Sequence, residues 1–340
     1  MEKTNKTKTA KWEARKKLII RGLLISLLST MVMVIIVGGY FIYLFNDFGD
    51  KIYQGVSAQD KTESGEEIIE PEEENDFGIT DLFSNTFDEP MNILVFGLDS
   101  RKGESLETGR TDTILIVTIN PDTKQVAAVS FPRDTYVLLP GYDHQKLNSA
   151  YYYGGLQLLT DTIEYNFDIK IDKYFAINFT AFSEIVDILG GIDVYTPSSM
   201  YYVASDIHVE LSPGEHHLNG EELLGYVRYR NDQAGDIGRI KRQQYAIRAL
   251  GEKAAGLKTV IKAPEILDIL GENILTDINK KDLLSIIKTY RNFSNKDWHP
   301  LTLNGKIARS EENNMWYYFY EKKDKEEVTS FVNRYYKGEN

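Results

Sequence analysis

Five arginines stand at positions where predicted strands end or predicted helices turn. They occur in the segments RTDT, SFPRDT, YVRYR and GDIGRIKRQQ, as Arg110, Arg133, Arg228, Arg230 and Arg239. A guanidinium offers a planar fork of donors that matches phosphate oxygens two at a time. Because the surrounding part of the chain is strongly acidic, a local cationic cluster indicates a bound polyanion. We expect that polyanion to be a pyrophosphate.

Two carboxylates accompany these arginines. Asp99 follows the apolar run NILVFGL, and Asp112 comes directly before the run TILIVTIN. If the two runs form an antiparallel pair of strands, the two aspartates lie close together at one sheet edge. Mg²⁺ takes one or two protein carboxylates and completes its shell with waters and phosphate oxygens. The pattern therefore predicts a Mg²⁺ (or Mn²⁺) site at Asp99 and Asp112, although a strand-end aspartate on its own is more often a turn former.

The remaining motifs are expected to reach the same edge. A third apolar run, QVAAVSF, follows a tight turn at 120–123 and ends at Pro132-Arg133-Asp134. Arg228 and Arg230 are two residues apart, so in an extended strand both project from one face. The segment LLGYVRYR is predicted to be a strand or a helix that passes into a strand, and the alternative to a functional role for YVRYR is an exposed edge strand. On the following helix, one face is predicted to carry Arg239, Arg242 and Gln243, which are spaced i, i+3 and i+4.

The elements that must position these side chains alternate between strands and helices. The segment 174–179 is a predicted strand, 180–189 an amphipathic helix that begins at an N-cap Thr180 and ends at Gly190-Gly191, and 192–195 another strand. The three apolar runs have the composition of buried central strands. Together they predict an α/β fold, a three-layer α/β/α sandwich with a central mixed sheet. Further helices are expected at about 149–166 with an interruption at Gly154-Gly155, at 238–256, 263–272 and 280–291, and after a strand at 315–320 up to Tyr336.

The first 89 residues differ from the rest. Residues 1–21 hold eight basic side chains against two acidic ones, and residues 22–45 carry no formal charge. An uncharged apolar run of this length is typical of a transmembrane helix, and a cleaved signal peptide is the alternative. Residues 46–89 form a predicted acidic linker and residues 90–340 the folded domain.

Charge also predicts where the domain lies. Basic residues before a span stay in the cytoplasm, so we expect a single-pass type II protein of the cell membrane with residues 46–340 outside. That part has 31 basic and 49 acidic residues, a net charge of −18, which disfavours nucleic-acid binding. The chain of 340 residues has no cysteine, so disulfides and thiolate chemistry are excluded.

The order of the motifs resembles a known family. NILVFGLDSR, RTDT, SFPRDT, KLN, AINFTAFSEIVDILGGIDV, YVRYR and GDIGRIKRQQ occur as they do in the LytR-CpsA-Psr family of Gram-positive bacteria, over about residues 92–250. This resemblance implies transfer of a wall polymer, such as teichoic acid or capsular polysaccharide, from a polyprenyl-pyrophosphate carrier onto peptidoglycan. The acceptor would be a muramic acid hydroxyl and the new bond a phosphodiester.

The resemblance also implies roles for individual residues. Asp99 and Asp112 match Mg²⁺-associated aspartates, while Arg133, Arg228 and Arg230 would neutralise charge during transfer and Asp134 or Asp236 would accept the proton or orient an arginine. The family has an apolar lipid pocket, for which the helix face with Phe179, Phe182, Ile185, Val186 and Leu189 is a candidate, unless these are ordinary core residues. The positions that match pyrophosphate-binding ones are Arg110, Arg133, Arg228, Arg230, Arg239 and Gln243.

Two other functions are compatible with the sequence. Water in place of the sugar hydroxyl would make the protein a hydrolase of the carrier pyrophosphate. A non-catalytic membrane regulator of envelope gene expression is the third hypothesis, although a cytoplasmic tail of 21 residues is too short for a folded DNA-binding domain.

Overall fold

The centre of the molecule is a six-stranded mixed sheet. The computed structural model describes residues 86–98, 111–204, 207–254, 273–311 and 313–339, together with Tyr40 and Tyr43. β1, β2 and β3 are antiparallel neighbours, β6 is parallel to β1 and β12 is parallel to β3. This confirms the predicted mixed sheet. Its strands, in spatial order, are β11 (Ile274–Thr276), β6 (Lys173–Asn178), β1 (Met91–Leu98), β2 (Thr111–Ile119), β3 (Val126–Ser130) and β12 (Trp298–Thr302).

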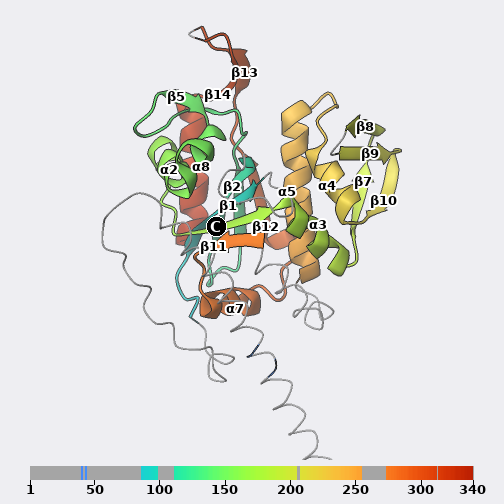
Figure 1. Ribbon diagram of the computed structural model, residues 1–340. Helices are drawn as coiled ribbons and strands as arrows, with labels where there is room; N and C mark the ends of the chain where they lie inside the picture. Colours follow the sequence, from blue (N-terminus) through green and yellow to red (C-terminus); the bar gives the residue numbers. More distant parts are fainter. Residues whose placement is uncertain are drawn as a thin grey trace, which may run out of the picture.

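Both faces of the sheet are covered. Alternate residues of β1 enter different cores: Leu94 and Phe96 pack with α2 (Ser149–Phe167) and α8 (Lys322–Lys337). Ile93 packs on the opposite face, in the cluster that also receives side chains of α5 (Gly235–Ala254) and α7 (Lys280–Thr289). Figure 1 shows these helices on the two sides of the sheet. Burial on both sides explains why β1 is a continuous apolar run instead of an alternating one.

A smaller unit with its own core lies beside α5. It contains α3 (Phe179–Ile188), α4 (Gly220–Arg228) and two antiparallel strand pairs, β7 (Ile192–Thr196) with β10 (Gly214–Leu218) and β8 (Met200–Ala204) with β9 (Ile207–Leu211). α3 and α4 approach so closely that a Cβ on Gly220 would lie 2.1 Å from the backbone oxygen of Ser183. Only glycine fits there. The sequence did not predict β8 and β9, whose segments lack long apolar runs.

A hairpin rises above the sheet. β13 (Lys306–Arg309) pairs with β14 (Trp316–Phe319), and Figure 1 shows it between α8 on one side and α5 on the other. Near its base lie the short pair β4 (Tyr136–Leu138) and β5 (His144–Lys146). The 3-10 turn η3 (Asn295–Asp297) precedes β12.

The predicted helix boundaries need one correction. The N-cap of α3 is Asn178, not Thr180, because the Asn178 side chain accepts a hydrogen bond from the Ala181 N–H over 2.8 Å. The predicted break in α2 is confirmed, since Gly154 and Gly155 have non-helical dihedral angles. Glycines 190 and 191 follow α3 with positive φ angles of 81° and 75°, as predicted.

Several predictions fall outside the described residues. They are the tail at 1–21, the linker at 46–85, the helix at 263–272 and, apart from Tyr40 and Tyr43, the membrane span at 22–45. Within the described parts of the chain, no helix combines the length and the apolar character that a membrane crossing needs.

Candidate active site

The convergence of the three apolar strands on one edge is confirmed. Leu98 at the end of β1 pairs with Thr111 at the start of β2, and Ser130 at the end of β3 pairs with Leu115. The loop after β3 therefore returns to the start of β2. There the Nη1 of Arg133 donates to the Oδ1 of Asp112 over 2.7 Å.

Two of the predicted site residues cannot be placed. Asp99 and Arg110 lie in the segment 99–110, outside the described residues. Of the predicted metal pair, only Asp112 is therefore described, at the wall of a polar cavity. One hard carboxylate beside a space for phosphate oxygens and waters is a donor set that Mg²⁺ accepts, so the residues present fit this ion.

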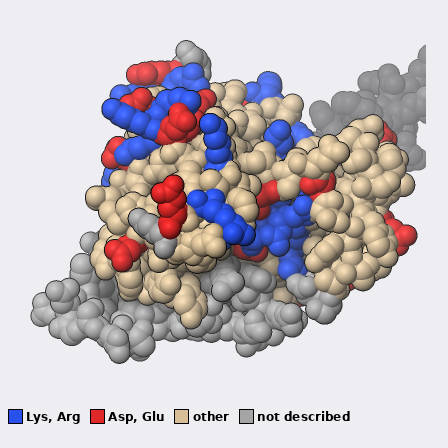
Figure 2. Space-filling model, turned by 90° about the horizontal axis from the view of Figure 1, so that it is seen from above, with Lys and Arg blue, Asp and Glu red and all other residues tan. Residues whose placement is uncertain are grey.

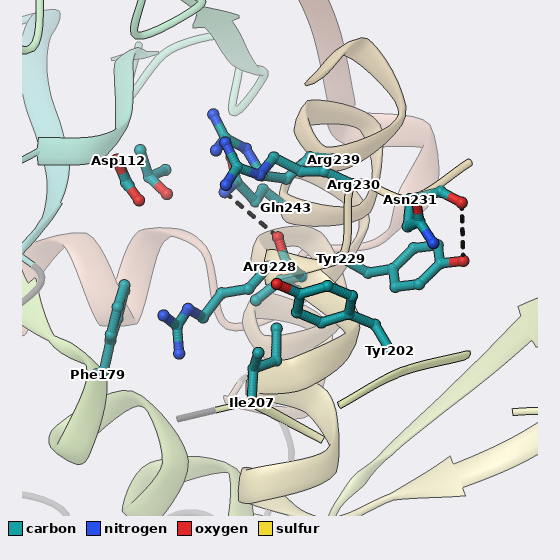
Figure 3. A pocket seen from close by; sticks show the side chains of 12 residues that line it. Asp112, Phe179, Tyr202, Ile207, Arg228, Tyr229, Arg230, Asn231, Arg239 and Gln243 are labelled. Carbon is teal, nitrogen blue, oxygen red and sulfur yellow. Dashed lines mark hydrogen bonds between the residues drawn. The ribbon is translucent and has the colours of Figure 1, made fainter. Parts of the chain in front are cut away.

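The motif YVRYR is not a strand, so of the two predictions for LLGYVRYR, a strand or a helix that passes into a strand, the first was wrong. α4 continues to Arg228, and Tyr229 is the C-cap residue with extended dihedral angles. Arg228 therefore lies in the last turn of α4, and Arg230 directly follows the C-cap residue. Both nevertheless reach the same cavity, because the chain changes direction between them (Figure 3). The Arg228 guanidinium also lies over the Phe179 ring, 4.9 Å from its centre.

Among the described cations of the site, Arg239 is the most deeply buried. It lies in the first turns of α5 with 3% of its side chain exposed, and its Nη2 is 2.9 Å from the Oδ1 of Asp236. Burial lowers the pKa of Arg239, and the neighbouring Arg133 and Arg230 act in the same direction, whereas Asp236 opposes them. Positive charge is therefore crowded here. An anion in the cavity would relieve that crowding.

Arg133 lies between acidic residues of two motifs. Burial alone would lower its pKa, but Asp112, through its charge and hydrogen bond, and Asp134 raise it overall. Its Nε is 3.8 Å from Asp134, beyond hydrogen-bond distance. Within the described parts of the chain, the Nε atoms of Arg133 and Arg239 are buried and have no hydrogen-bond partner. Buried donors of this kind are normally satisfied, and an oxyanion would do so.

Arg242 does not line the cavity but holds the turn that carries Arg230. Its Nε donates to the carbonyl of Tyr226 over 3.1 Å and its Nη1 to Asp232 over 2.7 Å, and it also donates to the carbonyl of Tyr229. These contacts fasten the turn that carries Arg230. The predicted shared face of α5 is therefore only partly present, since Arg239 and Gln243 line the cavity and Arg242 does not.

The polar cavity has a volume of about 410 Å³. Seen from above, a group of Lys and Arg side chains lies between two lobes of the molecule, with acidic side chains next to it (Figure 2). Figure 3 shows the arginines and Asp112 facing the cavity from different elements. Sequence reasoning missed Tyr202, Ile207 and Asn231. Of these, only Asn231 could have been found from the sequence, because it directly follows the motif YVRYR. The described residues that line the cavity are Asp112, Thr113, Phe179, Tyr202, Ile207, Val227, Arg228, Tyr229, Arg230, Asn231, Arg239 and Gln243.

An apolar cavity of about 310 Å³ adjoins it. It lies between the sheet and helices α3, α4 and α5, with Val95, Phe175 and Ile247 among its lining residues. Of the helix face predicted for a lipid pocket, Phe179 and Phe182 line it, whereas Val186 is buried in the neighbouring core and Ile185 and Leu189 are not in the lining. The two cavities share Thr113, Phe179, Val227 and Gln243.

The two candidate bases lie on the other side of the arginines. Asp134 accepts from Lys146 over 2.8 Å, and Asp236 contacts Arg239. Neither carboxylate lines the polar cavity. Both line a small hollow beneath the β13–β14 hairpin instead.

Comparison with known proteins agrees with these features. The model of the LytR_cpsA_psr family matches residues 40–334. A relative from Oceanobacillus iheyensis, named polyisoprenyl-teichoic acid–peptidoglycan teichoic acid transferase TagU, is 30% identical over 318 residues, which are 89% of this chain and 90% of the relative. The TagV protein of Bacillus subtilis, with the same activity in its name, is 30% identical over 313 residues, 89% of this chain and 75% of TagV.

Solved structures have the same fold. The crystal structure of B. subtilis TagV superposes with a TM-score of 0.64 at 31% identity, covering 74% of this chain and 98% of TagV. A structure of TagT bound to LI-WTA gives a TM-score of 0.59 at 28% identity, covering 73% of this chain and 91% of TagT. With a family model that spans most of its length and relatives matched nearly end to end, the chain belongs to the LytR_cpsA_psr family.

Proposed function

We propose that this protein transfers a glycopolymer, a teichoic acid or a capsular polysaccharide, from a polyprenyl-pyrophosphate carrier to a peptidoglycan hydroxyl. The observation that carries the proposal is the junction of the two cavities. One is lined by arginines and the other by hydrocarbon, and they share Phe179 and Val227. A ligand that fills both must be an anion attached to an apolar chain, as a polyprenyl pyrophosphate is.

Each end of the donor has a place in this arrangement. The polyprenyl chain lies in the apolar cavity, against Val95, Phe175 and Ile247. The pyrophosphate lies among Arg228, Arg230 and Arg239, with Gln243 at the boundary. The relatives TagU and TagV are named as teichoic acid transferases that use polyisoprenyl-linked substrates, which supports the same substrate class here.

The chemistry is a phosphoryl-type transfer. An acceptor oxygen attacks the phosphorus next to the glycan, the new P–O bond forms, and the P–O bond to the polyprenyl phosphate breaks. Polyprenyl phosphate leaves with the bonding electrons, and the hydroxyl proton passes to Asp134 or Asp236. The protein contributes mainly position and charge, because Arg133, Arg228 and Arg230 neutralise negative charge as it develops.

Mg²⁺ would be held by Asp112 together with Asp99 and would neutralise the phosphate oxygens. The Arg133–Asp112 hydrogen bond holds that carboxylate, which lines the polar cavity. We also place the protein in the cell membrane, with residues 22–45 as its span and the catalytic domain outside, where lipid-linked pyrophosphates are exposed to peptidoglycan.

Transfer is tested with the full-length protein in detergent micelles. A lipid-linked polymer, a peptidoglycan tetrasaccharide and Mg²⁺ are incubated together and the products analysed by mass spectrometry. The expected product is a polymer–saccharide phosphodiester, which is absent with Arg230→Ala and present with Arg248→Ala, an arginine of α5 paired with Glu252. Free glycan phosphate without any conjugate would instead identify a hydrolase.

A further inference from the structure

The β13–β14 hairpin presents an apolar surface that the core does not use. In paired strands, alternate side chains point to opposite faces. On one face, Tyr317 and Phe319 pack against Tyr136, each with ring centres 4.9 Å apart. On the other, Ile307 and Trp316 are 61% and 54% exposed. The exposed pair is therefore not needed to hold the hairpin in place.

The hairpin is fixed to the loop that carries Arg133 and Asp134. The N–H of Tyr318 donates to the carbonyl of Asp134 over 2.8 Å, and the Tyr318 hydroxyl donates to the carbonyl of Leu303 over 3.0 Å. Tyr318 itself is buried. Trp316, two residues before this anchor, is thus held at a defined position relative to the site, with the Arg309 guanidinium 5.1 Å from its ring centre.

Two hollows run along the base of the hairpin. The smaller one joins Trp316 and Ile307 to the carboxylates of Asp134 and Asp236. The larger one, of about 380 Å³, shares Ile307 and Tyr318 with it and adds the polar side chain of Asn304. The combined surface has an aromatic ring, an aliphatic side chain, an amide and two carboxylates.

The hollow with the two carboxylates lies directly behind the polar cavity. Arg239 lines the polar cavity, and its partner Asp236 lines the hollow, with 2.9 Å between them. In the same way Arg133 donates to Asp112 of the polar cavity and faces Asp134 of the hollow. The Arg239–Asp236 and Arg133–Asp134 contacts therefore separate the two spaces.

We propose that the hairpin groove, from Trp316 and Ile307 to Asn304, is the subsite for the acceptor saccharide. A pyranose has apolar C–H faces that stack on an indole ring, and its hydroxyls suit the amide of Asn304 and the carboxylates of Asp134 and Asp236. A sugar seated on Trp316 presents a hydroxyl to the carboxylates of Asp134 and Asp236, which contact Arg133 and Arg239. This inference rests on the proposed function.

The test uses steady-state kinetics of the full-length protein with a tetrasaccharide of N-acetylglucosamine and N-acetylmuramic acid as acceptor. Trp316→Ala and Ile307→Ser are expected to raise the KM for the tetrasaccharide roughly 3- to 10-fold each, the loss of one aromatic or apolar contact. The KM for the lipid-linked donor stays unchanged. Trp316→Phe, which keeps a ring, is expected to remain close to wild type. Tyr195→Ala removes an equally exposed ring from β7 and serves as the matched control.

A binding measurement separates this inference from the proposed function. Trp316 is exposed whereas Trp298 is buried, so tryptophan emission that changes on titration with the tetrasaccharide, and no longer changes in Trp316→Ala, reports occupancy of the groove. That response in a protein that transfers nothing would support the subsite and refute the proposed function. Undiminished transfer with an unchanged acceptor KM in both variants would refute the subsite alone. A raised donor KM, or an equal effect of Tyr195→Ala, would also overturn it.

Discussion

The Arg133 guanidinium donates to the Asp112 carboxylate over 2.7 Å, although the two residues are 21 positions apart in the sequence. This contact joins the loop after β3 to the start of β2 and places a cation beside the predicted metal ligand. Arg133→Ala is expected to lower the rate of transfer about 10²- to 10³-fold, because it removes preorganised positive charge from the transferring phosphate. The measurement is kcat at saturating Mg²⁺.

The control for that change is Arg133→Lys, which keeps the positive charge and loses the planar pair of guanidinium donors. We expect it to recover part of the rate. If Arg133→Ala retained full activity with an unaltered Mg²⁺ requirement, Arg133 would have no role in transfer.

The Arg239–Asp236 pair predicts a coupling in stability. Arg239→Ala leaves a largely buried carboxylate without its cation, and we expect the free energy of unfolding to fall by about 3 kcal/mol. Arg239→Ala combined with Asp236→Ala should be more stable than Arg239→Ala alone, since no unpaired charge remains. Chemical denaturation of the four proteins in this double-mutant cycle measures the effect. Simple addition of the two single effects would contradict it.

Arg242 should affect the KM for the donor although it does not line the cavity proposed for the pyrophosphate. Arg242→Ala loses hydrogen bonds to Tyr226, Tyr229 and Asp232, which corresponds to about 2 to 3 kcal/mol of stability, and frees the turn that positions Arg230. The KM for the donor is expected to rise. Arg248→Ala, on the same helix, is the control, because the ion pair of Arg248 with Glu252 lies outside the turn that carries Arg230. Equal donor kinetics in the two variants would show that the turn is held by other contacts.

The shared wall of the two cavities predicts selectivity for the lipid. Val227→Phe narrows the junction between the polar and apolar cavities. The KM for a donor with a long polyprenyl chain should rise about tenfold, whereas a donor with a single isoprene unit should be nearly unaffected, because it does not fill the apolar cavity. Kinetics with both donors measure the ratio. The same loss with both donors would place the lipid elsewhere.

His299 predicts a dependence of stability on pH. Burial lowers the pKa of His299, and Arg334 acts in the same direction, while Asp297 opposes them. The unfolded chain therefore binds a proton that the folded one does not, and stability decreases as the pH falls through the ordinary histidine value of about 6.5. Urea unfolding at pH 5 and pH 7.5 should give a smaller difference for His299→Gln than for the wild type. An identical difference would exclude His299 as the source.

The sheet edge could be predicted from sequence because three apolar runs that follow one another along the chain have few alternative arrangements. Antiparallel pairing of β1 with β2 and of β2 with β3 brings Asp112 and Arg133 together whatever the rest of the fold does. The mixed sheet and its two helical layers followed from the same runs. The hydrogen-bonded contact of the Arg133 and Asp112 side chains was not predictable.

YVRYR shows why other details could not be predicted. Its tyrosines and valine favour a strand by local propensity, yet Tyr226 and Val227 lie in a helix. The capping box at Asn219 and Glu222 starts that helix, and burial of Tyr226 and Val227 in the core of the smaller unit keeps it helical. Tertiary packing thus overrides propensity at this position. The hollow beneath the β13–β14 hairpin could not be predicted either, because Asp134, Asp236 and Trp316 come from three segments that are far apart in the sequence.

The apolar cavity lies between the sheet and α5, next to two of the protein's hydrophobic core clusters. A hydrocarbon chain inside it would extend both clusters and join them, so that the carrier lipid would complete the interior of the protein. Removal of that lipid leaves side chains such as Phe175 and Ile247 facing a void and forfeits their dispersion contacts. The melting temperature of the domain would then increase with the length of the bound chain. The stability of the folded state would therefore depend on whether a donor is bound.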